Sequence, residues 1–190
     1  MLTSLGLYFE VQPSRMQEPA FSSTGLSAYE YPVAMAVEKA QDVQKRRARG
    51  VILAADTAIH LDGRVLGKPS GPGDALETLS RLAGRTHEVI TGCCLLDKES
   101  GGKEAFFAVT EVTMASYPAE VLRAYIASKE PADKAGSYAI QGIGGFLVHS
   151  IHGSFSNVVG LPLPETVQAL LSLEAIRCAD TAPDLEGFAW

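Results

Sequence analysis

An aspartate that directly follows an apolar run is the first residue of this chain that suits chemistry. Val51 to Ala55 is apolar throughout, which is typical of a buried strand, and Asp56-Thr57 comes next. We expect Asp56 at the carboxyl end of that strand, where the ligands of open α/β sheets collect. A carboxylate there can hold a divalent cation or accept a proton from water. Asp56 can equally cap a turn through its own backbone, and position alone does not decide between these roles.

Four further polar residues lie in loops or turns rich in glycine or proline. Lys68 stands between a glycine and a proline, and Lys134 lies two residues before Gly136. Glycine lets a ligand approach the backbone, so either lysine suits a phosphate contact, although a surface lysine is the commoner case. Gln141 carries both a donor and an acceptor, which suits the edge of a pyrimidine base. For Asn157, in the turn before the last predicted helix, we favour a structural role.

The elements that must position these residues alternate between helices and strands. Helices are predicted from Pro32 onward and over Asp74–Ala83, Pro118–Ser128 and Pro164–Leu173. Strands are predicted over Val51–Ala55, His87–Leu96, Glu104–Ala115 and Phe146–Ile151, with a two-residue hairpin turn at Asp62-Gly63. Helices combined with hairpins indicate an α/β fold in which helices flank a mixed, twisted sheet.

The first part of the chain is less regular. Leu2 to Leu7 resembles the end of a helix that Gly6 terminates, and Tyr8 to Val11 alternates like a short strand. Pro13 to Tyr29 is rich in Ser, Pro and Gly, so we expect a loop there. The basic run from Lys45 to Arg49 follows a predicted helix, and we favour a solvated helix end over an anion site.

Composition and charge limit the classes of function. The chain has 190 residues, of which we assign 1–175 to one domain and 176–190 to a tail. A net charge of −6 argues against a protein that binds nucleic-acid polymers, whereas a small anionic substrate stays compatible with it. The 3 cysteines lack metal-type spacing and fit a reducing cytoplasm. No apolar run of membrane-spanning length and no signal peptide is evident, so we expect no membrane association.

The motifs taken together, in their order and spacing, resemble the Maf family of nucleoside triphosphate pyrophosphatases. The blocks that carry the resemblance are Ala55-Asp56-Thr57, Gly67-Lys68-Pro69, Leu82-Ala83-Gly84, His87-Glu88-Val89, Thr91-Gly92, Asp133-Lys134-Ala135-Gly136, Tyr138-Ala139-Ile140-Gln141-Gly142 and Asn157-Val158-Val159-Gly160-Leu161-Pro162-Leu163. The resemblance extends over roughly Leu2 to Leu171. It implies a mixed α/β fold related to that of inosine triphosphatases, with a cleft between two lobes.

The resemblance also implies an enzyme that cuts nucleoside triphosphates between the α and β phosphates with the help of Mg²⁺ or Mn²⁺. It assigns Asp56 as the catalytic base and, together with Glu18, as a metal ligand, although Gln17 stands where the family usually has Asp. The residues that match phosphate-contacting lysines of the family are Lys39, Lys68 and Lys134.

Two positions of the family accompany a preference for dTTP and UTP, and here they are occupied by Thr57 and Gln141. A homodimer is also implied by the resemblance. The family begins with a strand and a Ser-x-Ser-Pro-Arg-Arg loop, and we expect both to be missing here. Two alternatives therefore stay open. One is a catalytically impaired nucleotide-binding or regulatory protein linked to cell division, and the other is a house-cleaning hydrolase that acts on modified nucleotides.

Overall fold

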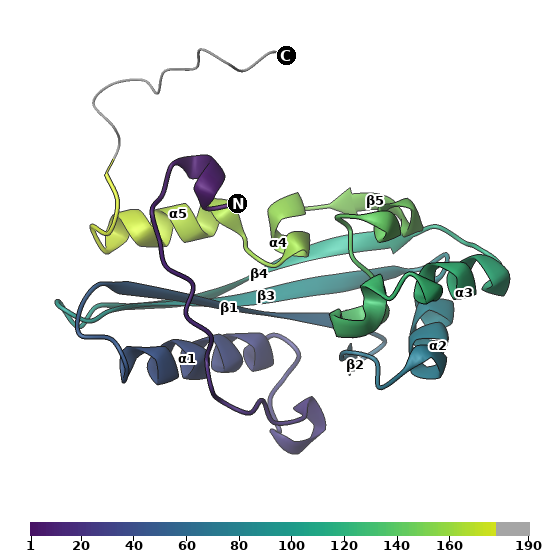
Figure 1. Ribbon diagram of the computed structural model, residues 1–190, viewed down its shortest axis with the longest axis horizontal. Coiled ribbons are helices and arrows are strands. Elements are labelled where there is room, and N and C mark those ends of the chain that lie inside the picture. Colours follow the sequence, from purple (N-terminus) through teal and green to yellow (C-terminus); the bar gives the residue numbers. More distant parts are fainter. Residues whose placement is uncertain (178–190) are drawn as a thin grey trace, which may run out of the picture.

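The centre of the molecule is a five-stranded sheet in the order β2-β1-β3-β4-β5 (Figure 1). The computed structural model describes residues 1–177, so the predicted tail lies almost entirely outside the described residues. The strands are β1 (Val51–Leu61), β2 (Arg64–Leu66), β3 (Thr86–Asp97), β4 (Lys103–Met114) and β5 (Val148–His152). The α/β class is confirmed. The pairings of the sheet are all antiparallel rather than mixed.

The prediction that the first strand ends before Asp56 is wrong. β1 continues to Leu61, and its ladder with β3 runs from Val51 opposite Asp97 to His60 opposite Glu88. Asp56 therefore lies in mid-strand, where it is paired with Gly92. The rule for carboxyl ends of parallel strands does not apply to this antiparallel sheet.

The second edge of β1 is only partly covered. β2 pairs with Ile59 to Leu61 and no further, so among residues 1–177 no strand lies beside the part of β1 from 51 to 58. The two strands are joined at Asp62 and Gly63, whose φ angles of 51° and 74° are both positive, as a type I′ hairpin turn requires. This confirms the predicted hairpin. Asp56 and Thr57 lie in the stretch of β1 that no strand of residues 1–177 pairs with on this side.

Helices cover both faces of the sheet, as Figure 1 shows. The helix α1 (Glu30–Gln44) packs on β1 and β3, whereas α4 (Phe155–Val159) and α5 (Leu163–Ser172) lie on the opposite face. The helices α2 (Pro72–Leu82) and α3 (Ala119–Ala127) pack on each other at one end of the molecule. The predicted helices are confirmed, with boundaries shifted by one or two residues. A side chain at Gly92 would overlap the backbone of Pro32 and Val33, so glycine allows α1 to approach β3 closely.

The core forms on both sides of this sheet. The largest buried apolar cluster joins the sheet to α2 and α3 and consists of Ile59, Leu61, Leu66, Leu79, Leu82, Val89, Val112, Met114, Leu122, Tyr125, Tyr138 and Leu147. Under α1, Ala36 and Ala40 pack on Cys94 and Leu96. On the opposite face Leu95 packs on Ala169 and Leu170 of α5. Burial on both faces holds β3 rigid, and β1 is aligned on it by their long ladder.

The N-terminal segment is a coil that crosses the open edge of β1 (Figure 1). A 3-10 turn at Thr3–Leu5 ends at Gly6, whose φ of 72° confirms the predicted stop. The prediction of a strand at Tyr8 to Val11 is wrong: this stretch pairs with no strand, and the Tyr8 side chain is fully exposed. Alternation of residue types needs a covered face to make a strand, and here none is covered.

The remaining connections are short and irregular. The predicted loop from Pro13 to Tyr29 is confirmed and contains one 3-10 turn, Phe21–Ser23. Further 3-10 turns lie at Glu130–Asp133, Ala135–Ser137 and Ile143–Leu147. Within residues 1–177, no helix combines the length and the apolar character that crossing a bilayer requires.

Candidate active site

A cavity of about 790 Å³ opens beside the uncovered edge of β1. The residues predicted from the sequence all line it: Glu18, Lys39, Asp56, Thr57, Lys68, Lys134 and Gln141. They come from the coil before α1, from α1, from β1, from the segment after β2 and from the loop before β5. The structure therefore brings every one of them to one place, and their individual roles stay predictions.

The part of the cavity on the α1 side of the sheet contains charged residues. Asp56 shares a sheet face with Gly92 and so points toward α1, where Lys39 Nζ lies 2.6 Å from Asp56 Oδ1. The same Nζ lies 2.7 Å from Glu18 Oε1. Two carboxylates from distant segments thus converge on one ammonium group. We call Glu18, Lys39 and Asp56 the charged triad.

Burial sets the acid–base character of this triad. The Asp56 side chain is only 10% exposed, and burial raises the pKa of its carboxyl despite the opposing effect of Lys39. For Lys39, burial alone would lower the pKa, but the bonds to Asp56 and Glu18 outweigh it and the pKa is raised. Lys39 is therefore charged at neutral pH. Asp56 is a stronger base than an exposed aspartate, which suits proton abstraction.

The other two lysines lie farther along the cavity wall. Lys134 Nζ pairs with Asp133 Oδ1 at 2.8 Å, and Lys68 is close enough to Asp56 to lower its pKa slightly. The charged residues that line the cavity are Glu18, Asp56, Asp133, Lys39, Lys68 and Lys134, so their formal charges cancel. Before a ligand arrives, Lys39 and Lys134 are each paired with a carboxylate.

The donor set of the triad fits a hard divalent cation. Glu18 and Asp56 offer carboxylate oxygens, the ligands that Mg²⁺ and Mn²⁺ prefer. Among the described residues no group of three or more His, Cys, Asp or Glu side chains converges as a metal cage. Mg²⁺ is commonly held by one or two carboxylates together with substrate phosphates and water, and the two carboxylates present here match that pattern.

The part of the cavity around Thr57, on the opposite face of the sheet, contains uncharged polar groups, and we call it the neutral side. Thr57 follows Asp56 along β1 and so points to the opposite face, where its Oγ1 lies 2.9 Å from Thr91 Oγ1. Thr91 is fully buried, and so is Asn157, whose backbone carbonyl accepts a bond from the Thr91 hydroxyl at 3.1 Å. We call Thr57, Thr91 and Asn157 the neutral chain. Asn157 is thus a structural residue, as its sequence context favoured.

The loop that carries Gln141 is held by a carboxylate. Glu130 accepts hydrogen bonds from the backbone N–H groups of Ile143 at 2.9 Å and Gly144 at 2.7 Å. Burial alone would raise the pKa of Glu130, but these bonds and one from Tyr125 lower it. Gln141 itself is exposed in the cavity, so its amide is available to a ligand.

Two aromatic residues that the sequence analysis did not single out also line the cavity. Tyr31 packs edge-on against Phe21, with ring centroids 5.4 Å apart, and its hydroxyl donates to the Pro19 carbonyl at 2.9 Å. These contacts fix the turn that carries Glu18. No spacing pattern in a loop rich in Ser and Pro reveals such a pair.

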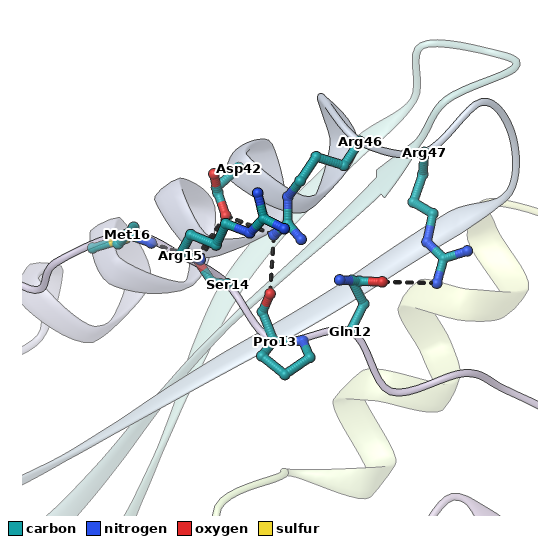
Figure 2. A network of polar contacts seen from close by, with 8 residues as sticks. All are labelled: Gln12, Pro13, Ser14, Arg15, Met16, Asp42, Arg46 and Arg47. Atoms are coloured by element: carbon teal, nitrogen blue, oxygen red, sulfur yellow. Dashed lines mark hydrogen bonds and ion pairs between the residues drawn. The ribbon is translucent and has the colours of Figure 1, made fainter.

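The segment before Glu18 is fastened to α1, as Figure 2 shows. One oxygen of Asp42 accepts bonds from the Ser14 hydroxyl at 3.1 Å, the Arg15 N–H at 2.8 Å and Arg46 at 2.8 Å. Arg46 also donates to the Pro13 carbonyl at 2.9 Å. Arg47 donates to Gln12 at 3.0 Å. The expected solvated helix end is therefore wrong for these two arginines, which bind the N-terminal coil. We call residues 12–16 the strap.

Comparisons with known proteins agree with this architecture. The family described as Maf-like protein matches residues 1–173. The chain is 48% identical over 174 residues to the dTTP/UTP pyrophosphatase of Nitratidesulfovibrio vulgaris, which covers 92% of this chain and 82% of that protein. It is 41% identical over 177 residues to the dTTP/UTP pyrophosphatase of Geotalea uraniireducens, which covers 93% of this chain and 90% of that protein. A match over nearly all described residues, with the motif residues gathered in one cavity, means that this chain belongs to the Maf family.

Proposed function

We propose that this chain hydrolyses dTTP and UTP to the nucleoside monophosphate and pyrophosphate. The observation that carries the proposal is the charged triad: a buried carboxylate with a raised pKa meets a lysine and a second carboxylate in a cavity of nucleotide size. Relatives at 48% and 41% identity bear the name dTTP/UTP pyrophosphatase, which supports the choice of substrate.

In this proposal Asp56 accepts a proton from water. The water oxygen forms a bond to the α-phosphorus, and the bond from that phosphorus to the α–β bridging oxygen breaks. The bridging oxygen and its electron pair leave with pyrophosphate. Lys39, Lys68 and Lys134 line the cavity, where their charges can stabilise the leaving group.

A divalent cation completes the charge balance of this proposal. Because the charges of the cavity cancel, a triphosphate entering it brings a large excess of negative charge. Glu18 and Asp56 are the residues that would hold Mg²⁺ or Mn²⁺. When bound, the metal would neutralise phosphate charge and orient water. Lys39 would then be free to move its contacts from the carboxylates to phosphate oxygens.

The neutral side of the cavity would receive the base. Thr57 and Gln141 offer polar atoms there, and a site built to bond a polar edge rejects bases that leave those atoms unpaired. A homodimer and a cytoplasmic location, with a house-cleaning role, stay further predictions. They rest on the resemblance described above and on the cysteine content. Size-exclusion chromatography with light scattering tests the first of them.

The test is pyrophosphate release from dTTP, UTP, CTP, GTP and 7-methyl-GTP with Mg²⁺ or Mn²⁺. We expect release from dTTP and UTP, and a loss of about 1,000-fold or more in Asp56→Asn, which removes the base. Asp97→Asn is the matched control, because Asp97 lies at the end of β3 and does not line this cavity. No release from any nucleotide by folded protein would contradict the proposal and favour a nucleotide-binding role without turnover.

A further inference from the structure

The neutral chain has a defined direction of hydrogen bonding. Thr91 Oγ1 lies within hydrogen-bond distance of two oxygens, Thr57 Oγ1 at 2.9 Å and the Asn157 carbonyl at 3.1 Å. A carbonyl oxygen only accepts, so the contact with Asn157 uses the single proton of Thr91. The contact with Thr57 then exists as a hydrogen bond only if the Thr57 hydroxyl donates to Thr91. Because Thr91 is fully buried, water does not offer the Thr91 hydroxyl another partner.

The Asn157 carbonyl is held in place by the rest of α4. The Asn157 side-chain amide donates to the Val89 carbonyl and to Thr110 Oγ1, each at 3.0 Å. Thr110 Oγ1 also accepts from the Ser154 N–H at 3.1 Å and donates to the Ser154 carbonyl at 3.3 Å. These bonds tie α4 to β3 and β4. The acceptor that orients Thr91 is therefore fixed before any ligand arrives.

The consequence appears at the cavity surface. Thr57 has one hydroxyl proton, and that proton points inward to Thr91, so the hydroxyl presents only lone pairs to the cavity. We propose that Thr91 is a positioning residue that makes Thr57 a hydrogen-bond acceptor, and that the site thereby selects pyrimidines carrying an N3–H over cytosine. This inference rests on the proposed function, in so far as the base meets Thr57.

The chemistry of the bases gives the direction of selection. Uracil and thymine carry a donor at N3, which pairs with an acceptor. Cytosine carries a lone pair at N3, which faces the Thr57 lone pair and leaves both without a proton. A freely rotating threonine hydroxyl would serve both bases equally, because it donates or accepts as needed. Selection therefore depends on the partner behind Thr57 as well as on Thr57 itself.

The test is the ratio of kcat/KM for UTP to that for CTP in Thr91→Val and Thr91→Ser. Valine keeps the shape of threonine but lacks the hydroxyl, which frees the Thr57 proton. The Asn157 carbonyl keeps a donor in that variant, because the Gly160 N–H also donates to it at 2.9 Å. We expect the ratio to fall about tenfold in Thr91→Val, mainly through faster use of CTP. Thr91→Ser should keep the wild-type ratio.

A double-mutant cycle separates positioning from packing. Thr57→Val removes the acceptor and should lower the same ratio, and adding Thr91→Val to it should change the ratio no further. Additive losses, or an unchanged ratio in folded Thr91→Val, would overturn the inference while hydrolysis of UTP still stood. If Thr91→Val does not fold, Thr57→Val decides alone, and a wild-type ratio in that variant overturns the inference.

Equilibrium binding distinguishes failure of the inference from failure of the proposed function. If the wild type hydrolyses no nucleotide, the probes are the α,β-methylene analogues of UTP and CTP, measured by calorimetry. A preference for the UTP analogue that Thr91→Val loses would support the inference although the proposed activity had failed. Equal binding of both analogues by the wild type, or a preference that Thr91→Val keeps, would overturn it.

Discussion

The two sides of the cavity differ in their exposure to water and in the groups that hold their side chains. The charged triad is partly open to water: the side chains of Glu18, Lys39 and Asp56 are 40%, 21% and 10% exposed. Its members are held mainly by one another. In the neutral chain, Thr91 and Asn157 are fully buried and bond to backbone carbonyls of neighbouring segments. Contacts within the triad can therefore be exchanged for contacts with a ligand, whereas the neutral chain is fixed in advance.

One step along β1 separates these two environments. Asp56 and Thr57 are adjacent, so their side chains leave the sheet on opposite faces. In the middle of a sheet they would never meet the same ligand. Because no strand of residues 1–177 pairs with β1 from 51 to 58, the cavity extends around this edge and both residues line it. A charged group and an uncharged group thus line one cavity, where they can meet two ends of one substrate.

The largest expected effect comes from breaking the charged triad. We expect Lys39→Met to lower kcat/KM about 100-fold or more for UTP, dTTP and CTP alike. Methionine removes the ammonium and leaves Glu18 and Asp56 facing each other, which raises the pKa of Asp56 further. The measurement is kcat/KM for the three nucleotides with saturating Mg²⁺.

We expect this loss of kcat/KM to be independent of the base, because the triad lies on the other side of the cavity from Thr57. Glu38→Gln is the matched control, because Glu38 is the exposed neighbour of Lys39 on α1 and does not line the cavity. A loss confined to one base in Lys39→Met would show that the charged side also takes part in base recognition. That result would contradict the assignment of phosphate binding to the charged side and of base recognition to the neutral side.

A smaller effect, on stability rather than turnover, is expected beneath the neutral side. His87 Nε2 lies 2.8 Å from the hydroxyl of Tyr138, which lines the cavity beside the loop of Gln141. Burial lowers the pKa of His87 from 6.5 to about 4. The folded state therefore binds this proton more weakly than the unfolded state. The contribution of neutral His87 to the free energy of unfolding is complete above pH 6.5. It is lost progressively as the pH falls from 6.5 to about 4.

Urea unfolding at about pH 7.5 and about pH 4.5 measures this loss, which we expect to approach about 3 kcal/mol. His87→Gln keeps a polar group near Tyr138 but does not titrate. Its free energy of unfolding should therefore fall less than that of the wild type between the two pH values, by the same amount of about 3 kcal/mol. His149→Gln, at an exposed position, is the control. Equal pH dependence in the wild type and His87→Gln would show that His87 is not the group responsible.

The order of the motifs predicted which residues line the cavity better than it predicted how those residues are held there. All the predicted site residues line one cavity, because each belongs to a motif with recognisable neighbours. The prediction that Asp56 follows the end of its strand was wrong. Aspartate is disfavoured inside a strand unless its carboxylate binds a partner from another segment. That partner is Lys39 on α1, and no local pattern connects the two residues. The extent of β1 could therefore not be read from its own sequence.

The same limit applies to the contacts between the strap and α1. Arg46 and Arg47 follow a helix, where basic residues are normally solvated, and their partners in the strap lie more than 30 residues earlier in the chain. The order of bonds in the neutral chain was equally hidden, because Thr57, Thr91 and Asn157 come from three separate elements. Helix and strand periodicity reflects local burial, whereas these contacts depend on how distant segments meet.

The smallest expected effect tests how far the charged side depends on the strap (Figure 2). Asp42 accepts bonds from the Arg15 N–H, Arg46 and Ser14, and these hold its pKa below the usual range. Asp42→Asn should raise KM for UTP and dTTP about two- to threefold and leave kcat unchanged, since exposed ion pairs contribute little. Asp97→Asn, at the last residue of β3, is the control. A fall in kcat would mean that the strap fixes Glu18 during the reaction itself. A change in base preference would mean that the two sides of the cavity are coupled through α1.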